Sequence, residues 1–411
     1  MKNNTPDDKS IPVAANNGVN ASNSDATQEH NRLIAAQGEF VLERNPMDKT
    51  LKAWEAADEY LLKYLDENTL VSPLKRVLIV NDAFGGLSVA LADYRPTMMS
   101  DSFLAEQALA KNLSRNGINP AQVKFENGLQ TLQPNFDLIL IKIPKSLALL
   151  EAQLLLLRAS ILPDTRVLAA GMSRAVHKST LQLFETLIGP TTTSLAWKKA
   201  RLIFVDPSPT ASEPESQDLA CYTVETDREF IVSSQAGVFS GNRLDPGSRL
   251  LIENMPRSEH YEKIADLGCG NGVIGIIAAS LSAQARLVFV DESYQAVASA
   301  KQNFIRAFGA GREADFQVTN CFQGIANDSL DLVLNNPPFH QQQTIGDAIA
   351  WQMFVEARRV LKPEAELWVV GNRHLGYHAK LRKIFGRCEV VQSNQKFVLL
   401  RAVKRKLTDA D

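Results

Sequence analysis

The feature that most constrains the fold is an internal repeat, in which short segments recur about 190 to 200 residues later. Phe136-Asp-Leu-Ile-Leu140 is similar to Leu330-Asp-Leu-Val-Leu334. Lys199-Ala-Arg-Leu-Ile203 is similar to Lys396-Phe-Val-Leu-Leu400. A repeat at a constant separation indicates duplicated structural units. We therefore expect two tandem domains of the same fold.

The second unit alternates short apolar runs with segments of helical spacing. This order is typical of an α/β protein with a doubly wound, mostly parallel sheet. The predicted strands lie near 263–267, 287–290, 316–318, 331–334 and 366–370.

The ends of the chain and its middle differ in composition from the two units. Residues 1–32 are rich in Asn, Ser, Asp and Ala, which predicts a disordered tail. Residues 206–220 are rich in Pro, Ser and Glu without periodicity, which indicates a linker. The predicted domains are 33–205 and 221–406, followed by a tail at 407–411.

A glycine-rich loop predicts a nucleoside cofactor. Asp266-x-Gly268-x-Gly270-x-Gly272 follows an apolar strand and opens a helix, so the backbone can approach a ligand closely. The next strand ends in Asp291, a carboxylate that can accept hydrogen bonds from two ribose hydroxyls. This pattern is typical of enzymes that use S-adenosylmethionine.

An NAD-linked enzyme is the competing interpretation, because Gly270-x-Gly272-x-x-Gly275 also fits the dinucleotide fingerprint. Asp266, just before the first glycine, favours a cofactor with a cationic methionine end. A pyrophosphate would be repelled by a carboxylate there.

The prediction for the chemistry depends on Asn336-Pro337-Pro338-Phe339, which follows the strand at 331–334. The amide oxygen of Asn336 and the rigid carbonyl of Pro337 can accept the hydrogens of an aromatic amino group, which returns its lone pair to nitrogen. Phe339 offers a flat face to an unstacked base. The structural alternative is a Pro-Pro turn that closes a strand.

The first unit has lost both patterns. It has Lys142-Ile143-Pro144 where the second has Asn336-Pro337-Pro338, and its loop keeps only Gly85 and Gly86. We therefore expect a degenerate domain that binds neither cofactor nor target base. It serves either as a folding partner or as an RNA-docking surface through Lys142, Lys145, Lys198, Lys199 and Arg201.

Charge and composition exclude some classes of protein. The net charge of −2 does not itself indicate nucleic-acid binding, but the segment 372–406 is strongly basic, with Glu389 as its only acid. That segment is either a solvated face or a set of phosphate contacts beside the pocket. No apolar run is long enough to span a membrane and no secretory signal is present, so we expect a cytoplasmic protein. The four cysteines are too dispersed for a metal site or a disulfide framework.

Five segments together resemble one enzyme family over nearly all of residues 36–406. The chain resembles class I S-adenosylmethionine-dependent methyltransferases that act on guanine in ribosomal RNA, and in particular those of the large subunit. The segments are Trp54–Tyr60, Asn81–Gly85, Leu195–Arg201, Asn335–Gln342 and Asn372–His374.

The resemblance implies two Rossmann-like domains with seven-stranded sheets whose last strand is antiparallel. It also implies methylation of the exocyclic amino nitrogen (N2) of a guanine in large-subunit (23S) ribosomal RNA. Guanine in small-subunit ribosomal RNA, another planar amino group such as that of cytosine, adenine or a protein glutamine, and the NAD-linked enzyme remain alternatives. By resemblance, Asp266, Gly268, Gly270 and Gly272 lie along the cofactor, Asp291 holds its ribose, Asn320 lies near its adenine, and Asn336, Pro337, Pro338 and Phe339 form the target pocket.

His340 has two possible roles. It either shuttles the proton lost after transfer or acts as a supporting hydrogen-bond partner.

Overall fold

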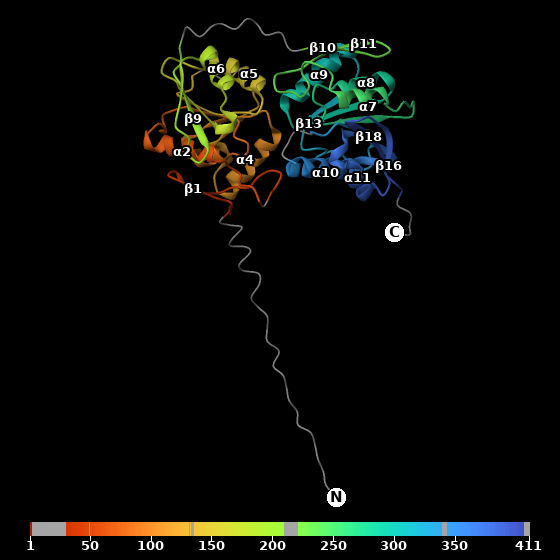
Figure 1. Cartoon of the computed structure of the whole chain (residues 1–411), viewed down its shortest axis with the longest axis horizontal. Coiled ribbons are helices and arrows are strands. Elements are labelled where there is room, and N and C mark those ends of the chain that lie inside the picture. Colours follow the sequence, from red (N-terminus) through yellow and green to blue (C-terminus); the bar gives the residue numbers. More distant parts are fainter. Residues whose placement is uncertain are drawn as a thin grey trace.

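The computed structural model describes Met1 and residues 30–48, 50–130, 132, 135–208, 221–338 and 343–406. The predicted tails at 1–32 and 407–411 and the predicted linker at 206–220 lie largely or wholly outside these residues. Figure 1 shows two domains side by side, the first coloured red to yellow and the second green to blue.

The first domain begins with a small hairpin and continues as alternating strands and helices. Its apolar runs become strands buried on both faces, as in Val77–Val80. The elements are β1 (Arg32–Ala35), β2 (Gly38–Val41), α2 (Ala56–Glu67), β3 (Val77–Val80), α3 (Gly86–Ala90), β4 (Thr97–Met99), α4 (Phe103–Arg115), β5 (Lys124–Glu126), β6 (Leu138–Lys142), α5 (Leu147–Arg158), β7 (Arg166–Met172), α6 (Lys178–Leu187), β8 (Thr191–Thr193) and β9 (Ala200–Val205).

The second domain repeats this plan, including the hairpin that precedes the sheet. Its elements are β10 (Cys221–Glu225), β11 (Glu229–Ser233), α7 (Pro246–Glu253), β12 (Lys263–Leu267), α8 (Val273–Leu281), β13 (Arg286–Asp291), α9 (Tyr294–Phe308), β14 (Ala314–Val318), β15 (Leu330–Asn335), α10 (Gln343–Val360), β16 (Leu361–Asn372), α11 (Tyr377–Phe385), β17 (Glu389–Ser393) and β18 (Phe397–Val403).

The two sheets have the same strand order. The first is β5-β4-β3-β6-β7-β9-β8 and the second is β14-β13-β12-β15-β16-β18-β17. In each sheet the last strand along the chain, β9 or β18, pairs antiparallel with both of its neighbours. The prediction of two duplicated, mostly parallel α/β sheets of seven strands is therefore confirmed.

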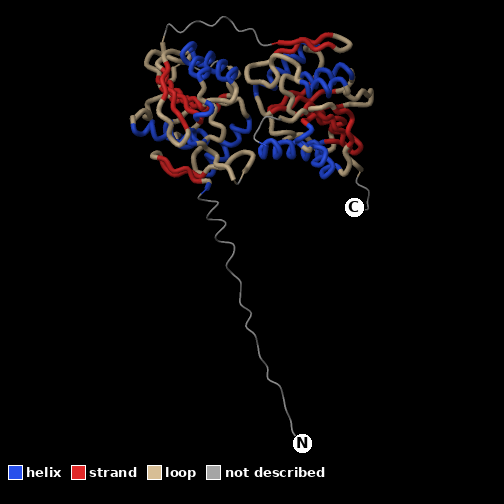
Figure 2. Tube along the Cα trace, in the orientation of Figure 1, coloured by secondary structure: helices blue, strands red, loops and turns tan. Residues whose placement is uncertain are grey.

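Side chains of the central strands alternate between two cores, one on each face of the second sheet. Leu332 and Leu334 pack in one core, whereas Val333 packs in the other. Helices flank the strands on both sides in Figure 2. Because both faces are covered, nearly continuous apolar runs are stable as strands there.

In each domain one buried asparagine forms hydrogen bonds both with the segment at the end of the hairpin and with the glycine turn. In the first, Asn112 Nδ2 donates to the carbonyls of Glu43 (2.9 Å) and Phe84 (2.8 Å). In the second, Asn303 Nδ2 donates to the carbonyls of Ser233 (2.7 Å) and Asn271 (2.9 Å). The duplication therefore extends to side-chain contacts.

The domains meet through corresponding segments, the turns between β4 and α4 and between β13 and α9. Ser102 and Ser293 form an antiparallel bridge. The amide of Phe103 donates to the carbonyl of Glu292 at 2.9 Å, and the amide of Tyr294 donates to that of Asp101 at 3.0 Å. This interface directly follows Asp291, the predicted ribose ligand.

Candidate active site

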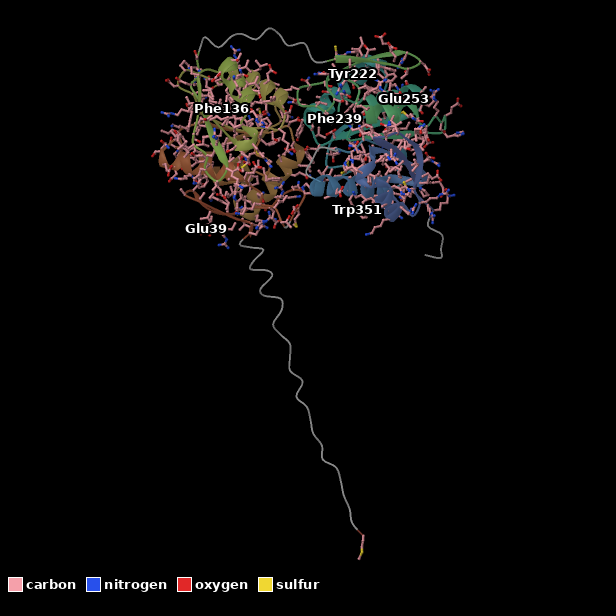
Figure 3. All side chains as sticks on the ribbon, in the orientation of Figure 1. Glu39, Phe136, Tyr222, Phe239, Glu253 and Trp351 are labelled. Carbon is pink, nitrogen blue, oxygen red and sulfur yellow. The ribbon has the colours of Figure 1, made fainter. Side chains whose placement is uncertain are left out.

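A cavity of about 500 Å³ lies at the carboxyl ends of β12, β13 and β15. This is where open α/β sheets bind their ligands. Figure 3 shows Phe239, one of its lining residues, at the boundary between the two domains. The first domain contributes Pro46, Asp101, Leu104 and Lys145 to the lining.

The cavity brings together most of the predicted site residues. Asp266 and Gly272 do not line it. Phe339 and His340 lie outside the described residues. The predicted residues in the lining are Gly268, Gly270, Asp291, Asn320, Asn336, Pro337 and Pro338.

The glycine loop is held in a conformation that excludes larger residues at one position. Gly272, which caps α8, has φ of 82°. A Cβ atom there would lie 2.9 Å from Ala300 Cα, so both the left-handed backbone and the space require glycine. Gly275 packs directly against the Phe289 ring. The third glycine of the dinucleotide-like pattern is thus explained by helix–sheet packing, which specifies no particular cofactor.

Asp266 lies beneath the loop rather than on the cavity wall. Its side chain is buried, and Oδ2 accepts a hydrogen bond from the Gly275 amide at 2.8 Å. Oδ1 has no partner in the described part of the chain. Burial, with a smaller contribution from Asp291, raises the pKa of Asp266 to about 8. The geometry thus shows this side chain holding the first turn of α8, which follows the loop.

Asp291 lies at the end of β13, with its carboxylate against the loop and facing the cavity. One oxygen accepts from the Gly270 amide at 2.9 Å and the other from the Ser293 amide at 3.0 Å. A carboxylate has about four acceptor positions, so acceptor capacity remains for a hydroxyl donor. Burial raises the pKa of Asp291. Asn320 belongs to the same cavity, where its Oδ1 accepts from Gln352 Nε2 at 3.1 Å.

Asn336 is held so that its amide oxygen is free. Its Nδ2 donates to Ser248 Oγ at 2.9 Å and to Asp245 Oδ2 at 3.3 Å. Because a carboxylate can only accept, the nitrogen must face Asp245. Oδ1 then has no partner among the described residues. Asn336 lines the cavity, and an oriented, unpaired acceptor there can receive an amino group from a ligand.

The residues that orient Asn336 were missed by sequence analysis. Asp245 caps α7 by accepting from the Ser248 amide at 2.9 Å. Asp followed by Pro246 at the first helical position is a helix-start signal that was available in the sequence. Their distance of 88 to 91 residues from Asn336 along the chain hid the contact itself.

In the first domain an ion pair occupies the corresponding position. Lys142, at the end of β6, places Nζ 2.6 Å from Asp58 Oδ1 and 3.8 Å from Glu55 Oε2, at the start of α2. The side chains of Lys142 and Asp58 are only 13% and 3% exposed. The suggestion that Lys142 docks RNA is therefore wrong, because its charge is buried and neutralised.

The other candidate cations of the first domain differ in accessibility. Lys145 is exposed at the rim of the cavity. Lys198 is exposed but paired with Glu59 at 2.6 Å. Lys199 and Arg201 are exposed.

The described part of the chain shows neither a metal-binding cluster nor a membrane-spanning helix. Its residues contain no group of three or more His, Cys, Asp or Glu side chains arranged to hold a metal ion. Within the same residues, no helix is both long and apolar enough to cross a membrane. The thiol of Cys269 lies in the glycine loop, where burial raises its pKa.

Comparison with protein families divides the chain in the same way as the two sheets. Residues 30–209 match the RLMG N-terminal domain, and residues 229–401 match the methyltransferase small domain. A solved T. thermophilus 16S rRNA N2 methyltransferase, in complex with AdoMet and guanosine, shares the fold with a TM-score of 0.72 at 18% identity, over 92% of this chain and 100% of that one.

Two curated relatives carry the name ribosomal RNA large subunit methyltransferase G. The Streptomyces coelicolor protein is 46% identical over 374 residues, which are 89% of this chain and 98% of the relative. The Yersinia enterocolitica protein is 48% identical over 380 residues, or 90% and 94% of the two chains. At this identity and coverage, the chain belongs to the ribosomal RNA large subunit methyltransferase G family.

Proposed function

We propose that the protein transfers a methyl group from S-adenosylmethionine to the exocyclic N2 of a guanine in large-subunit (23S) ribosomal RNA. The observation that carries this proposal is the free amide oxygen of Asn336, fixed by Asp245 and Ser248 in the same cavity as Asp291. The names of the relatives support the choice of RNA, and the complex of the T. thermophilus enzyme supports the cofactor and the nucleoside.

The residues present fit a sulfonium nucleoside. Asp291 retains acceptor capacity for ribose hydroxyls, and the buried Asp266 Oδ1 has no partner among the described residues. S-adenosylmethionine, when bound, supplies a methyl group on a cationic sulfur. We assign the cofactor site to Asp266, Gly268, Gly270, Gly272, Asp291 and Asn320.

The target site is assigned to Asn336, Pro337, Pro338 and Phe339. Asn336 Oδ1 accepts one N–H of the guanine amino group, and the Pro337 carbonyl accepts the other. These contacts return lone-pair density to nitrogen, which forms the new C–N bond as the S–C bond breaks. The methylated amino group then releases one proton to solvent water. Stacking on Phe339 stays a prediction, since this residue is outside the described part.

The charge of the cavity disfavours an NAD-linked reaction. Its described lining contains the acids Asp101, Asp245, Asp291 and Glu292 and a single cation, Lys145. A pyrophosphate would meet net repulsion, whereas a sulfonium would meet attraction. Other planar amino groups could be held by Asn336 in the same way, and the names of the relatives favour ribosomal RNA over them.

The domain roles follow from the same assignment. We propose that residues 221–406 carry catalysis, that 33–205 form a degenerate partner, and that the protein works in the cytoplasm, where ribosomal RNA is modified. The separate sheets and the two family matches support the division.

Two measurements test the proposal. Calorimetric titration should give binding of S-adenosylhomocysteine and none of NADH. Purified protein should then place N2-methylguanosine in unmodified large-subunit RNA, detected by mass spectrometry of nucleosides, but not in small-subunit RNA. Methylation of only the small-subunit RNA, or of a base other than guanine, would overturn the substrate.

A further inference from the structure

A groove of about 650 Å³ lies on the outer side of α10 and α11, outside the active-site cavity. Trp351, Val355 and Arg358 project into it from α10. Their spacing of four and three residues places them on one helix face. Trp351 is 36% exposed and Val355 41%, so the groove presents apolar surface to solvent. Figure 3 shows Trp351 on the blue part of the second domain, away from Phe239.

Unpaired cations surround this apolar strip. Lys383 Nζ lies 5.4 Å from the centre of the Trp351 ring, and Arg405 also lines the groove. Arg358, Lys383 and Arg405 are exposed, and none forms an ion pair with a carboxylate in the described part of the chain. Asp328, the one acid among the described residues that line the groove, is paired with Lys404 at 2.6 Å. The described lining of the groove therefore carries a net positive charge.

The cations of the basic segment 372–406 fall into two classes, those paired with a carboxylate and those that are not. Several of its cations have structural partners: Lys380 pairs with Asp347, and Arg401 pairs with Glu366. Lys383 and Arg405 do not pair in this way and instead flank an exposed tryptophan. Ion pairs with structural roles thus account for part of the positive charge of the segment. Lys383 and Arg405, which have no such partner among the described residues, line the groove.

The groove and the active site share one helix. Gln352 and Met353, next to Trp351 in the chain, line the active-site cavity. α10 also begins just after the loop that carries Asn336. A ligand in the groove is therefore separated from the cavity only by the width of this helix, about 10 Å.

We propose that this groove binds an unpaired segment of ribosomal RNA, with one base against Trp351 and phosphates on Arg358, Lys383 and Arg405. An exposed aromatic ring flanked by cations is the combination that binds single-stranded nucleic acid, because the ring stacks a base and the cations follow the backbone. The excess of cations selects this ligand over an apolar helix of a partner protein. The proposal rests on the proposed function, since it assumes that RNA is the substrate.

The test compares groove variants for their affinity toward in vitro transcribed large-subunit RNA. Trp351→Ala should weaken binding about fivefold or more, and Trp351→Phe should retain most of the affinity. Arg358→Ala combined with Lys383→Ala should lower the slope of log affinity against log salt by about two. The matched controls are Leu74→Ala, an exposed apolar residue of the first domain, and Lys178→Ala, an exposed lysine there, which should change neither.

A second readout reports stacking directly. Trp54 and Trp368 are buried and Trp197 is partly buried. RNA should therefore quench the emission of Trp351, and Trp351→Phe should remove that part of the quenching; in a Trp197→Phe background the remaining quenching should come from Trp351 alone. Affinity for S-adenosylhomocysteine and the melting temperature should equal the parental values in every groove variant, which shows that folding and the cofactor site are intact.

Parental RNA affinity in Trp351→Ala and in the double variant would overturn the proposal. Parental binding of naked RNA, with methylation lost only on particles that contain ribosomal proteins, would also overturn it and assign the groove to a protein. If the parental chain binds the RNA without methylating it, the proposed function fails while the groove comparison still holds. If the parental chain does not bind the RNA at all, both fail.

Discussion

The carboxylate of Asp101 accepts a hydrogen bond from Ser293 Oγ at 2.6 Å, which joins the degenerate domain to the residue two positions after Asp291. Its other oxygen accepts from the Gln295 amide at 2.7 Å. In the reverse direction, Ser102 Oγ donates to Glu292 Oε2 at 2.5 Å. Each helix-capping serine is thus oriented by an acid of the opposite domain, and the first domain helps to position the turn that carries Asp291.

Asp101→Ala should therefore weaken binding of S-adenosylhomocysteine although it removes no predicted contact with the cofactor. Hydrogen bonds to charged groups are worth about 1.5–3 kcal/mol each, so transmission of even one bond's energy to Asp291 should weaken binding about tenfold or more. Titration calorimetry measures the effect. Glu39→Ala, which removes an exposed acid on the hairpin of the same domain, is the matched control. Equal affinity in the two variants would show that the first domain does not position Asp291.

Asn336→Ala should leave cofactor affinity at the parental value and remove most turnover. The amide oxygen acts on the target nitrogen, so its loss should lower kcat more than it raises KM. Asp245→Ala should reproduce part of the defect, because the amide would lose the carboxylate that fixes its orientation. Steady-state methylation at saturating RNA measures both. Parental kcat in Asn336→Ala would remove Asn336 from the target site.

Asp266 should make the protein without cofactor less stable as pH rises. Its pKa of about 8 in the folded protein lies above the ordinary value, so the folded state holds a proton that the unfolded state has lost between about pH 4 and 8. Folding then takes up protons, and stability falls through that window. The variant Asp266→Asn has no titratable group at this position, so its stability should not show this decrease.

The difference in melting temperature, variant minus parent, should accordingly become more positive from pH 5 to pH 8. Each kcal/mol should shift the midpoint by about 2–4 °C. Other buried acids, such as Glu292, are common to both proteins and cancel in the difference. A difference that is constant with pH would mean that Asp266 titrates at its ordinary pKa.

Lys142→Ala should destabilise the first domain without changing the salt dependence of RNA binding. The substitution leaves Asp58 buried beside Asp82 without its cation, and breaking a buried pair in this way costs about 3–5 kcal/mol. Lys142→Met combined with Asp58→Leu should recover part of the stability, because apolar residues can replace a buried ion pair but not the hydrogen bond that Asp58 Oδ2 accepts from the Glu55 amide at 2.7 Å. Denaturant unfolding gives the comparison. A changed salt slope in a folded Lys142 variant would reopen a role in RNA contact.

The sequence predicted the architecture because its signals are local. Apolar runs such as 331–334 mark buried strands, and Gly272 marks a turn that only glycine can form. The contacts that the sequence did not predict join residues that are far apart along the chain. They are Asn336 to Asp245, Lys142 to Asp58, and Asp101 to Ser293, which are separated by 91, 84 and 192 positions. Apolar periodicity carries no information about such polar pairs. The edge strand β17 also escaped prediction, since its residues are largely exposed and its sequence lacks a buried run.

The reciprocal bridge between Ser102 and Ser293 has the geometry of an isologous dimer contact, in which the same two surfaces meet in both directions. Here both surfaces belong to one polypeptide. A homodimer must keep both halves identical, so any loss in one active site is a loss in both. A covalent pair is free of that restriction: one half can exchange its pocket for a buried ion pair and still present its half of the contact. The intact site gains a permanent neighbour whose presence does not depend on protein concentration.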